Sequence, residues 1–354
     1  MKAMNMAGLR KSREQARAHH LASMLLEEGS WRAESVPASI IALGSTSIHL
    51  GFSRKDPLTD LIVGAFLSPA KSQLLQETSS TVFILRSEDD IVLPSLEWMH
   101  PWITAQEAVP HPITNPYRLF VDRNHGMIYC FDPRRRMGCI YLRPTAHLDI
   151  RSLITPFRLM WSWIAETHDQ IVLHAAAIRC RGVGLLVPGP SGSGKSTLAL
   201  GLGTEEGNCL ISDDCVVVQG HTAHAVYDRA KQPDKAPKAS LAPSLRGIRG
   251  RSRAKRAVSL SSDVPFFQRD TKIHALIFPS VVGRSGLYSL SRDEAAEALA
   301  IDSMREVFGG TPWQREEIKR LTHEIPSFKL LLGPSQTDNH SQLYSLVGQL
   351  REGA

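Results

Sequence analysis

The sequence lacks cysteines spaced as CxxC and has no long apolar run. Its most basic segment also lacks aromatic side chains. Its 5 cysteines are odd in number and never spaced as CxxC, which argues against a disulfide framework and a zinc site. No segment approaches the about 18 consecutive apolar residues of a membrane-spanning helix. Residues 1–20 are basic but have no apolar stretch behind them, so we expect no secretory signal. We therefore expect a cytoplasmic protein without a membrane partner.

The most basic segment, residues 229–256, contains 10 lysines and arginines. No aromatic residue that could stack on a base lies between Lys231 and Ser262, so a nucleic-acid partner is not expected. A solvated loop explains such a run of charge, and the alternatives are a lid over a phosphate or a docking surface for an acidic peptide. The net charge of the whole chain is only +6, which favours anionic ligands.

The chain is long enough, at 354 residues, for two domains. Residues 1–30 favour a helix, and from residue 37 to about 142 short apolar runs alternate with Pro, Gly and Asp, which predicts strands and hairpins. After residue 150, helix and strand patterns alternate. The sequence therefore predicts an α/β protein with a smaller, mostly β N-terminal region (1–150) and a second domain (151–354).

The second domain has a regular succession of predicted elements. A helix begins at Pro156, and a later helix over 291–309 has Ser291 as its N-cap with Glu294 three residues on. We expect a further helix from Lys195 to about Leu202 and a closing helix over 341–353. The predicted strands cover residues 171–178, 184–187, 208–212, 215–218, 273–279, 286–291 and 327–333.

The segment Gly189–Ser196, GPSGSGKS, matches the phosphate-loop pattern GxxxxGK[ST]. Glycines let the backbone curl so that N–H groups point at a phosphate, and the helix that follows favours anions at its N-terminus. Lys195 would reach the β- and γ-phosphates, and the Ser196 hydroxyl would bind Mg²⁺. We therefore predict a site for ATP and Mg²⁺ made by Gly189, Ser191, Gly192, Ser193, Gly194, Lys195, Ser196 and Thr197.

Two consecutive aspartates, Asp213 and Asp214, follow an apolar strand shortly after this loop. We expect that strand to adjoin the strand of the phosphate loop, so that one carboxylate can hold Mg²⁺ while the other accepts a proton from an attacking hydroxyl. The alternative is a solvated turn, in which aspartate is common. Spacing alone does not assign the two roles.

Residues 171–220 resemble the catalytic domain of the HPr kinase/phosphorylase family and its relatives. The resemblance rests on His174 in VLHAAAI, on the loop Gly189–Ser196, and on the aspartate pair in LISDDCVVV. It implies a fold akin to phosphoenolpyruvate carboxykinases and transfer of phosphate from ATP to a serine hydroxyl. By this resemblance Asp213 is the base, Asp214 helps Ser196 to hold Mg²⁺, and His174 is catalytic or contacts phosphate. A hydrogen-bonded core histidine is the alternative for His174.

HPr kinases have glutamate directly after the loop serine, where this chain has Thr197. We therefore expect an acceptor other than HPr, namely a protein or a ribosomally made peptide such as a lasso-peptide precursor. Two alternatives stay open: a nucleotide-binding regulatory protein with little transfer activity, and a reversible kinase/phosphorylase. Residues 1–150 show no catalytic pattern and are expected to recognise the acceptor. A homo-oligomer is also left open.

Overall fold

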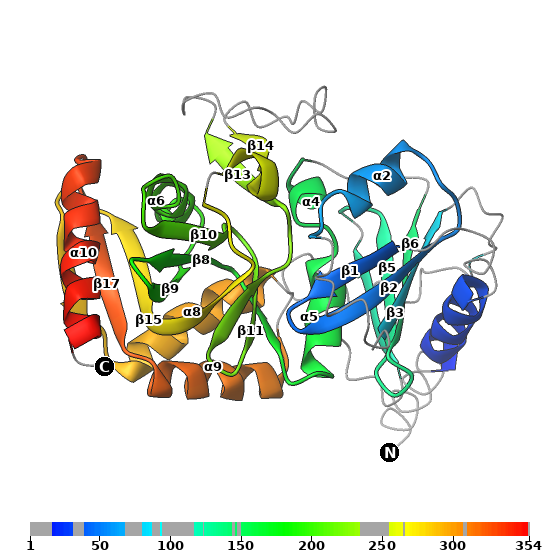
Figure 1. Cartoon of the computed structure of the whole chain (residues 1–354). Coiled ribbons are helices and arrows are strands. Elements are labelled where there is room, and N and C mark those ends of the chain that lie inside the picture. Colours follow the sequence, from blue (N-terminus) through cyan, green and yellow to red (C-terminus); the bar gives the residue numbers. More distant parts are fainter. Residues whose placement is uncertain are drawn as a thin grey trace, which may run out of the picture. The chain divides into compact units, whose positions relative to one another are not determined.

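A computed structural model describes residues 16–30, 39–67, 80–86, 93, 117–122, 124–143, 146, 150–233, 255–264, 266–306 and 310–352. The chain is an α/β protein with mixed sheets (Figure 1). It divides into two compact units. We call the first, Met1–Ile41, Thr46–Val63 and Ser68–Leu148, the N-terminal unit, and the second, Ala42–Ser45, Gly64–Leu67 and Asp149–Ala354, the P-loop unit.

The N-terminal unit is built around a six-stranded sheet in the order β1-β2-β3-β6-β5-β4. Strand β3 pairs in parallel with β2 and β6, whereas β4, β5 and β6 are antiparallel. Residues 16–30 are helical and pack Leu21 and Leu25 against this sheet. The predicted β-rich N-terminal region is thus observed, although the run at 90–94 lies almost wholly outside the described residues. The elements are β1 (Ser39–Leu43), β2 (Thr46–Phe52), α2 (Pro57–Val63), β3 (Ser80–Arg86), β4 (Arg118–Asp122), β5 (Met127–Asp132) and β6 (Met137–Leu142).

The P-loop unit contains a nine-stranded mixed sheet whose main path runs β10-β8-β9-β15-β12-β11-β7. Strand β17 pairs in parallel with β15 and antiparallel with β16. Its strands are β7 (Ile171–Leu173), β8 (Ala175–Cys180), β9 (Val183–Pro188), β10 (Asn208–Ser212), β11 (Val216–Gln219), β12 (Thr222–Ala225), β13 (Arg229–Pro233), β14 (Lys255–Ser259), β15 (Asp270–Val281), β16 (Gly286–Ser289) and β17 (Ser327–Leu332). Its helices are α4 (Ile150–Ile154), α5 (Arg158–Glu166), α6 (Lys195–Leu202), α7 (Leu260–Asp263), α8 (Arg292–Glu306), α9 (Pro312–Glu324) and α10 (Gln336–Glu352).

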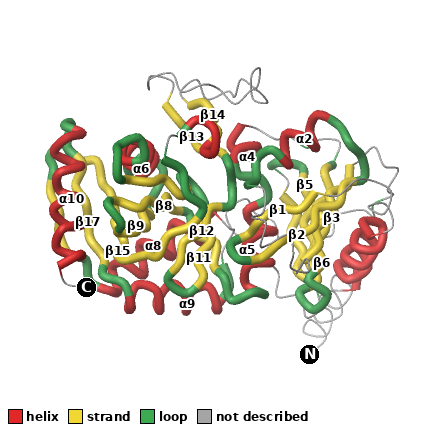
Figure 2. Tube along the Cα trace, in the orientation of Figure 1, coloured by secondary structure: helices red, strands yellow, loops and turns green. Residues whose placement is uncertain are grey.

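Helices cover both faces of this sheet, which explains why β9 is apolar and buried along its whole length. Leu185 and Val187 of β9 belong to a core with α6 and α10, whereas Leu186 between them belongs to a core with α8 and α9. In the view of Figure 2 the strands lie between α6 above and α9 below. The β9 backbone also lies close to β15, because a Cβ at Gly184 would collide with the carbonyl oxygen of Lys272.

Local sequence signals predict part of this unit correctly. Helix α6 has the predicted bounds, and Ser291 and Glu294 form the predicted capping box before α8. Residues 307–309 of the predicted helix lie outside the described residues. The closing helix begins five residues earlier than predicted, at Gln336, and α9 was not predicted, although Thr311 and Gln314 form a second capping box before it.

Three other expectations need correction. The strand predicted over 171–178 is two strands, because the chain breaks at His174 and β7 pairs with β11 while β8 pairs with β9 and β10. Helix α5 begins at Arg158 and not at Pro156, because Phe157 has a left-handed backbone with φ 63°. The basic segment is not all loop, since β13 and β14 pair at its two ends. Its central part, residues 234–254, lies outside the described residues. This part contains six of the basic residues: Lys235, Lys238, Arg246, Arg249, Arg251 and Arg253.

Candidate functional site

The loop between β9 and α6 has a backbone that only glycine adopts easily. Gly189, Gly192 and Gly194 have φ values of 143°, 90° and 100°. A Cβ at Gly194 would also collide with Leu332 at the end of β17. This loop leads directly into the N-terminus of α6, where the N–H groups of a first helical turn favour an anion.

The side chains of the loop divide into buried and exposed sets. Lys195 is buried, and its Nζ donates to the carbonyl oxygens of Gly189 and of Pro190, the latter at 3.2 Å. Ser193 is also buried, and among the described residues its Oγ has no hydrogen-bond partner. Ser196 is half-buried at the start of α6. Ser191 and Thr197 are exposed, and so is Gly192, whereas Gly189 is buried and Gly194 half-buried.

The two aspartates lie in a bend between β10 and β11. Asp213 is 0% exposed and Asp214 is 7% exposed, so the alternative of a solvated turn is wrong. Ser212 Oγ donates to the carbonyl oxygen of Cys215 at 2.6 Å and holds the bend. The expectation that their strand adjoins the strand of the phosphate loop is also wrong, because β8 lies between β10 and β9.

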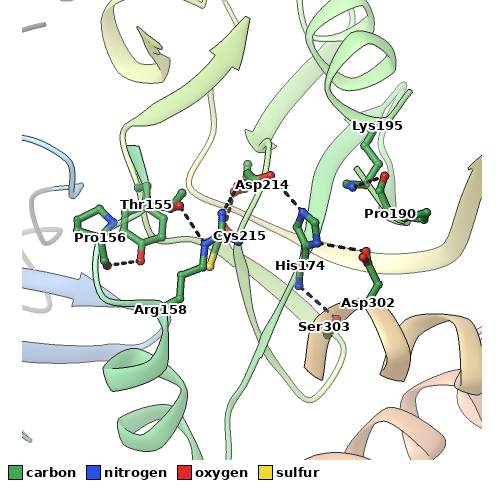
Figure 3. Close-up of polar contacts among 12 residues, drawn as sticks. Thr155, Pro156, Arg158, His174, Pro190, Lys195, Asp214, Cys215, Asp302 and Ser303 are labelled. Carbon is green, nitrogen blue, oxygen red and sulfur yellow. Dashed lines mark hydrogen bonds and ion pairs between the residues drawn. The ribbon is translucent and has the colours of Figure 1, made fainter. Parts of the chain in front are cut away.

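His174 lies between two carboxylates from distant parts of the chain (Figure 3). Its Nε2 is 3.2 Å from Asp214 Oδ1, and its Nδ1 is 3.2 Å from Asp302 Oδ2 on α8. Its backbone N–H donates to Ser303 Oγ at 3.3 Å. Burial by itself lowers the pKa of His174, but the carboxylates of Asp214 and Asp302 outweigh it and raise the pKa above its ordinary value. The positive charge of Lys195 acts in the opposite direction, which places this lysine within electrostatic reach of the imidazole.

Arg158 completes the surroundings of Asp214. Its Nη2 donates to Asp214 Oδ2, and its Nε donates to Thr155 Oγ1 at 2.9 Å. The side chains of Arg158 and Asp214 are only 10% and 8% exposed. Asp214 therefore binds a cationic side chain at one oxygen and His174 at the other.

Sequence reasoning missed Arg158, Asp302 and Ser303, although two signals were present. On α8, Asp302 continues the buried stripe of Ala295 and Leu299 at helical spacing, so a carboxylate stands where a core residue is expected. Arg158 lies in the first turn of α5, where the helix dipole disfavours a cation. Both residues break a local rule, as functional residues often do.

Three predicted site residues carry oxygen atoms of the kind that binds Mg²⁺. Asp213, Asp214 and Ser196 offer carboxylate and hydroxyl oxygens, the donor type that Mg²⁺ prefers. Across the part of the chain that the structure describes, no three His, Cys, Asp or Glu side chains are grouped as a metal site. Mg²⁺ commonly takes one or two carboxylates together with substrate phosphates and water, and these residues fit that mode.

No protein-family model matches this sequence, and no curated protein matches it. Within the described ranges, no helix has both the length and the apolar character needed to cross a membrane. The site residues therefore have to be interpreted from their own geometry. His174 and Asp214 are in contact, Lys195 acts electrostatically on His174, and Asp213, beside Asp214 in the sequence, is buried.

Proposed function

We propose that this protein is an ATP- and Mg²⁺-dependent phosphotransferase that phosphorylates a serine hydroxyl of a protein or a ribosomally made peptide. The observation that carries the proposal is the pair of buried aspartates in the same unit as a phosphate loop. Burial of two adjacent carboxylates is costly, and a protein that only bound a nucleotide would not need a candidate base. The resemblance of residues 171–220 to HPr kinases supports the proposal, which includes a fold of that kind for the P-loop unit.

The residues divide into binding and proton-transfer roles. The loop N–H groups and Lys195 bind the phosphates, and Ser196 and Asp214 hold Mg²⁺, which when bound neutralises phosphate charge. The acceptor serine Oγ forms a bond to the γ-phosphorus while the bond to the leaving ADP oxygen breaks. Asp213 accepts the serine proton on a carboxylate oxygen. His174 acts on this arrangement through Asp214, which it contacts directly.

The test is incubation of the purified protein with Mg²⁺ and γ-labelled ATP, using serine-containing peptides encoded by neighbouring genes as acceptors. The wild-type protein is expected to label a serine. The variant Asp213→Asn should lose about 10²- to 10⁴-fold in transfer, the range typical for removal of a general base, while it binds ATP as the wild type does. Asp293→Asn, which changes an exposed aspartate on α8, is the matched control and should transfer normally.

Other outcomes would change the assignment. Undiminished labelling by Asp213→Asn would show that Asp213 is not the base. ATP binding without label on any peptide would favour a nucleotide-binding regulatory protein. Removal of the label by inorganic phosphate, with release of pyrophosphate, would show a reversible kinase/phosphorylase.

A further inference from the structure

The turn between α4 and α5 has a strained backbone at a buried position. Phe157 is 4% exposed and has φ 63° and ψ 33°, a left-handed conformation that a bulky side chain rarely adopts. Such strain persists only where the surroundings enforce it, and it is concentrated at functional sites. The residue directly after the strained position is Arg158.

Three buried side chains hold this turn. The carbonyl oxygen of Pro156 accepts hydrogen bonds from Trp161 Nε1 and from Tyr227 Oη, both at 2.7 Å. The carbonyl oxygen of Leu153 accepts one from Arg229 Nη1 at 2.5 Å. All three donors are at most 2% exposed, and burial of the Arg229 guanidinium lowers its pKa to about 10.

The turn positions the guanidinium of Arg158, which two hydrogen bonds hold in place. Thr155 Oγ1, from the turn itself, accepts from Arg158 Nε, and Asp214 Oδ2 accepts from Nη2 (Figure 3). A buried ion pair is weak evidence for stability, because the desolvation of two charges offsets their attraction. The strained turn and the buried ion pair therefore point to a role beyond folding.

We infer that Arg158 is a positioning residue of the phosphotransfer site, which holds the carboxylate of Asp214 in the orientation that metal-bound nucleotide requires. The inference rests on the proposed function. Arg158 fixes one oxygen of Asp214 and His174 contacts the other, so the carboxylate has one orientation before a ligand arrives. Groups that orient a metal-binding carboxylate in this way contribute to metal affinity without touching the metal.

The test measures binding without any acceptor. Mn²⁺, a paramagnetic substitute for Mg²⁺, is titrated by electron paramagnetic resonance into the full-length protein with a non-hydrolysable ATP analogue. Binding of the same analogue without metal is measured separately. Arg158→Met should weaken Mn²⁺ binding by about 10- to 100-fold, the usual loss when a partner of a metal ligand is removed. Metal-free nucleotide binding should stay within about threefold, because Thr155 and Asp214, to which Arg158 donates, lie outside the phosphate loop.

Two further variants keep the test meaningful if Arg158→Met does not fold. Arg158→Lys retains the charge but replaces the planar fork of donors by a single nitrogen, so its Mn²⁺ affinity should lie between those of wild type and Arg158→Met. Thr155→Val removes the acceptor for Nε and should weaken Mn²⁺ binding by about threefold. Arg320→Met, at an exposed ion pair on α9, is the control and should bind Mn²⁺ normally.

The outcomes separate this inference from the proposed function. Tighter Mn²⁺ binding by Arg158→Met would overturn the inference, because Arg158 would then compete with the metal. An equal loss of metal-free nucleotide binding would also overturn it and leave a purely structural role. A wild-type protein that binds nucleotide and Mn²⁺ but labels no peptide would contradict the proposed function, while the effect of Arg158 on binding would still be measured.

Discussion

The two units of the molecule satisfy their buried carboxylates in different ways. In the N-terminal unit, Asp122 contacts its own turn: it accepts from the backbone N–H of His125 at 3.0 Å, and its Oδ2 lies 2.7 Å from Nδ1 of the same residue. Asp132 accepts from the backbone N–H groups of Arg134 and Arg135 at 2.9 and 3.2 Å. In the P-loop unit, Asp214 instead contacts Arg158 and His174, which are 56 and 40 residues away in the sequence.

This difference separates carboxylates that shape turns from carboxylates that assemble a site. A carboxylate that binds the N–H groups of its own turn replaces lost water contacts at little cost in chain entropy. A carboxylate that binds charged side chains from distant segments requires the whole fold, and the buried charges gain little net stability. The long-range pairing of Asp214 therefore supports the proposed function, and mutation can compare it with the local pairing of Asp132.

The largest expected effect comes from replacing the buried ion pair by apolar residues. The variant Asp214→Leu alone leaves Arg158 buried without this carboxylate. The double variant Arg158→Met/Asp214→Leu should have an unfolding free energy about 3 kcal/mol higher than that single variant. Its phosphotransfer should nevertheless fall at least about 10²-fold, as when one preorganised charge is removed. Denaturant unfolding and labelling from γ-labelled ATP measure the two effects. If the double variant were as unstable as Asp214→Leu, the ion pair would serve stability. The distinction between Asp214 and the turn-forming carboxylates would then be wrong.

A smaller effect is expected from Asp302→Asn, which removes one of the two charges beside His174. The asparagine keeps an oxygen near Nδ1, so the unfolding free energy should change by less than about 1 kcal/mol. Because His174 acts on the site through Asp214, kcat should fall about tenfold with little change in the KM for ATP. Glu297→Gln, an exposed change on the same helix, is the control. A lower stability with unchanged kcat would assign Asp302 to folding.

The smallest effect on activity is expected in the N-terminal unit. Asp132→Ala leaves two backbone N–H groups without their acceptor and should cost about 1–2 kcal/mol of unfolding free energy. Asp132→Asn keeps the accepting oxygen and should cost less. ATP binding, measured by calorimetry, should be unchanged in both variants. Weaker ATP binding would mean that this carboxylate also serves the site, contrary to the comparison.

Local rules predict the parts of the fold and site that depend on neighbours in sequence. The phosphate loop, the bounds of α6 and the capping box at Ser291 follow from glycine conformation and helix capping within a few residues. The α/β class follows from alternating helix and strand patterns. The same local reasoning places His174 inside a strand, because nothing in IVLHAAAI shows that the two halves pair with different strands.

The rest depends on partners that sequence spacing does not identify. Arg158 and Asp302 reach the site only because α5 and α8 pack on the sheet, and their signals were violations of local preference rather than motifs. The order of strands is also non-local, which is why β10 was expected next to β9 when β8 lies between them. The bend that buries Asp213 and Asp214 has the composition of a solvated turn, and only tertiary packing removes it from water.

The packing of Leu332 against Gly194 also sets an order of events during protein synthesis. The end of β17 lies where a side chain at Gly194 would be, so the last strand of the sheet supports the start of α6. The nascent chain exposes its glycine loop more than 130 residues before this support has left the ribosome, since Gly194 and Leu332 are 138 positions apart (332 − 194). A nucleotide site of the proposed kind would therefore form only once the C-terminal part of the chain is in place.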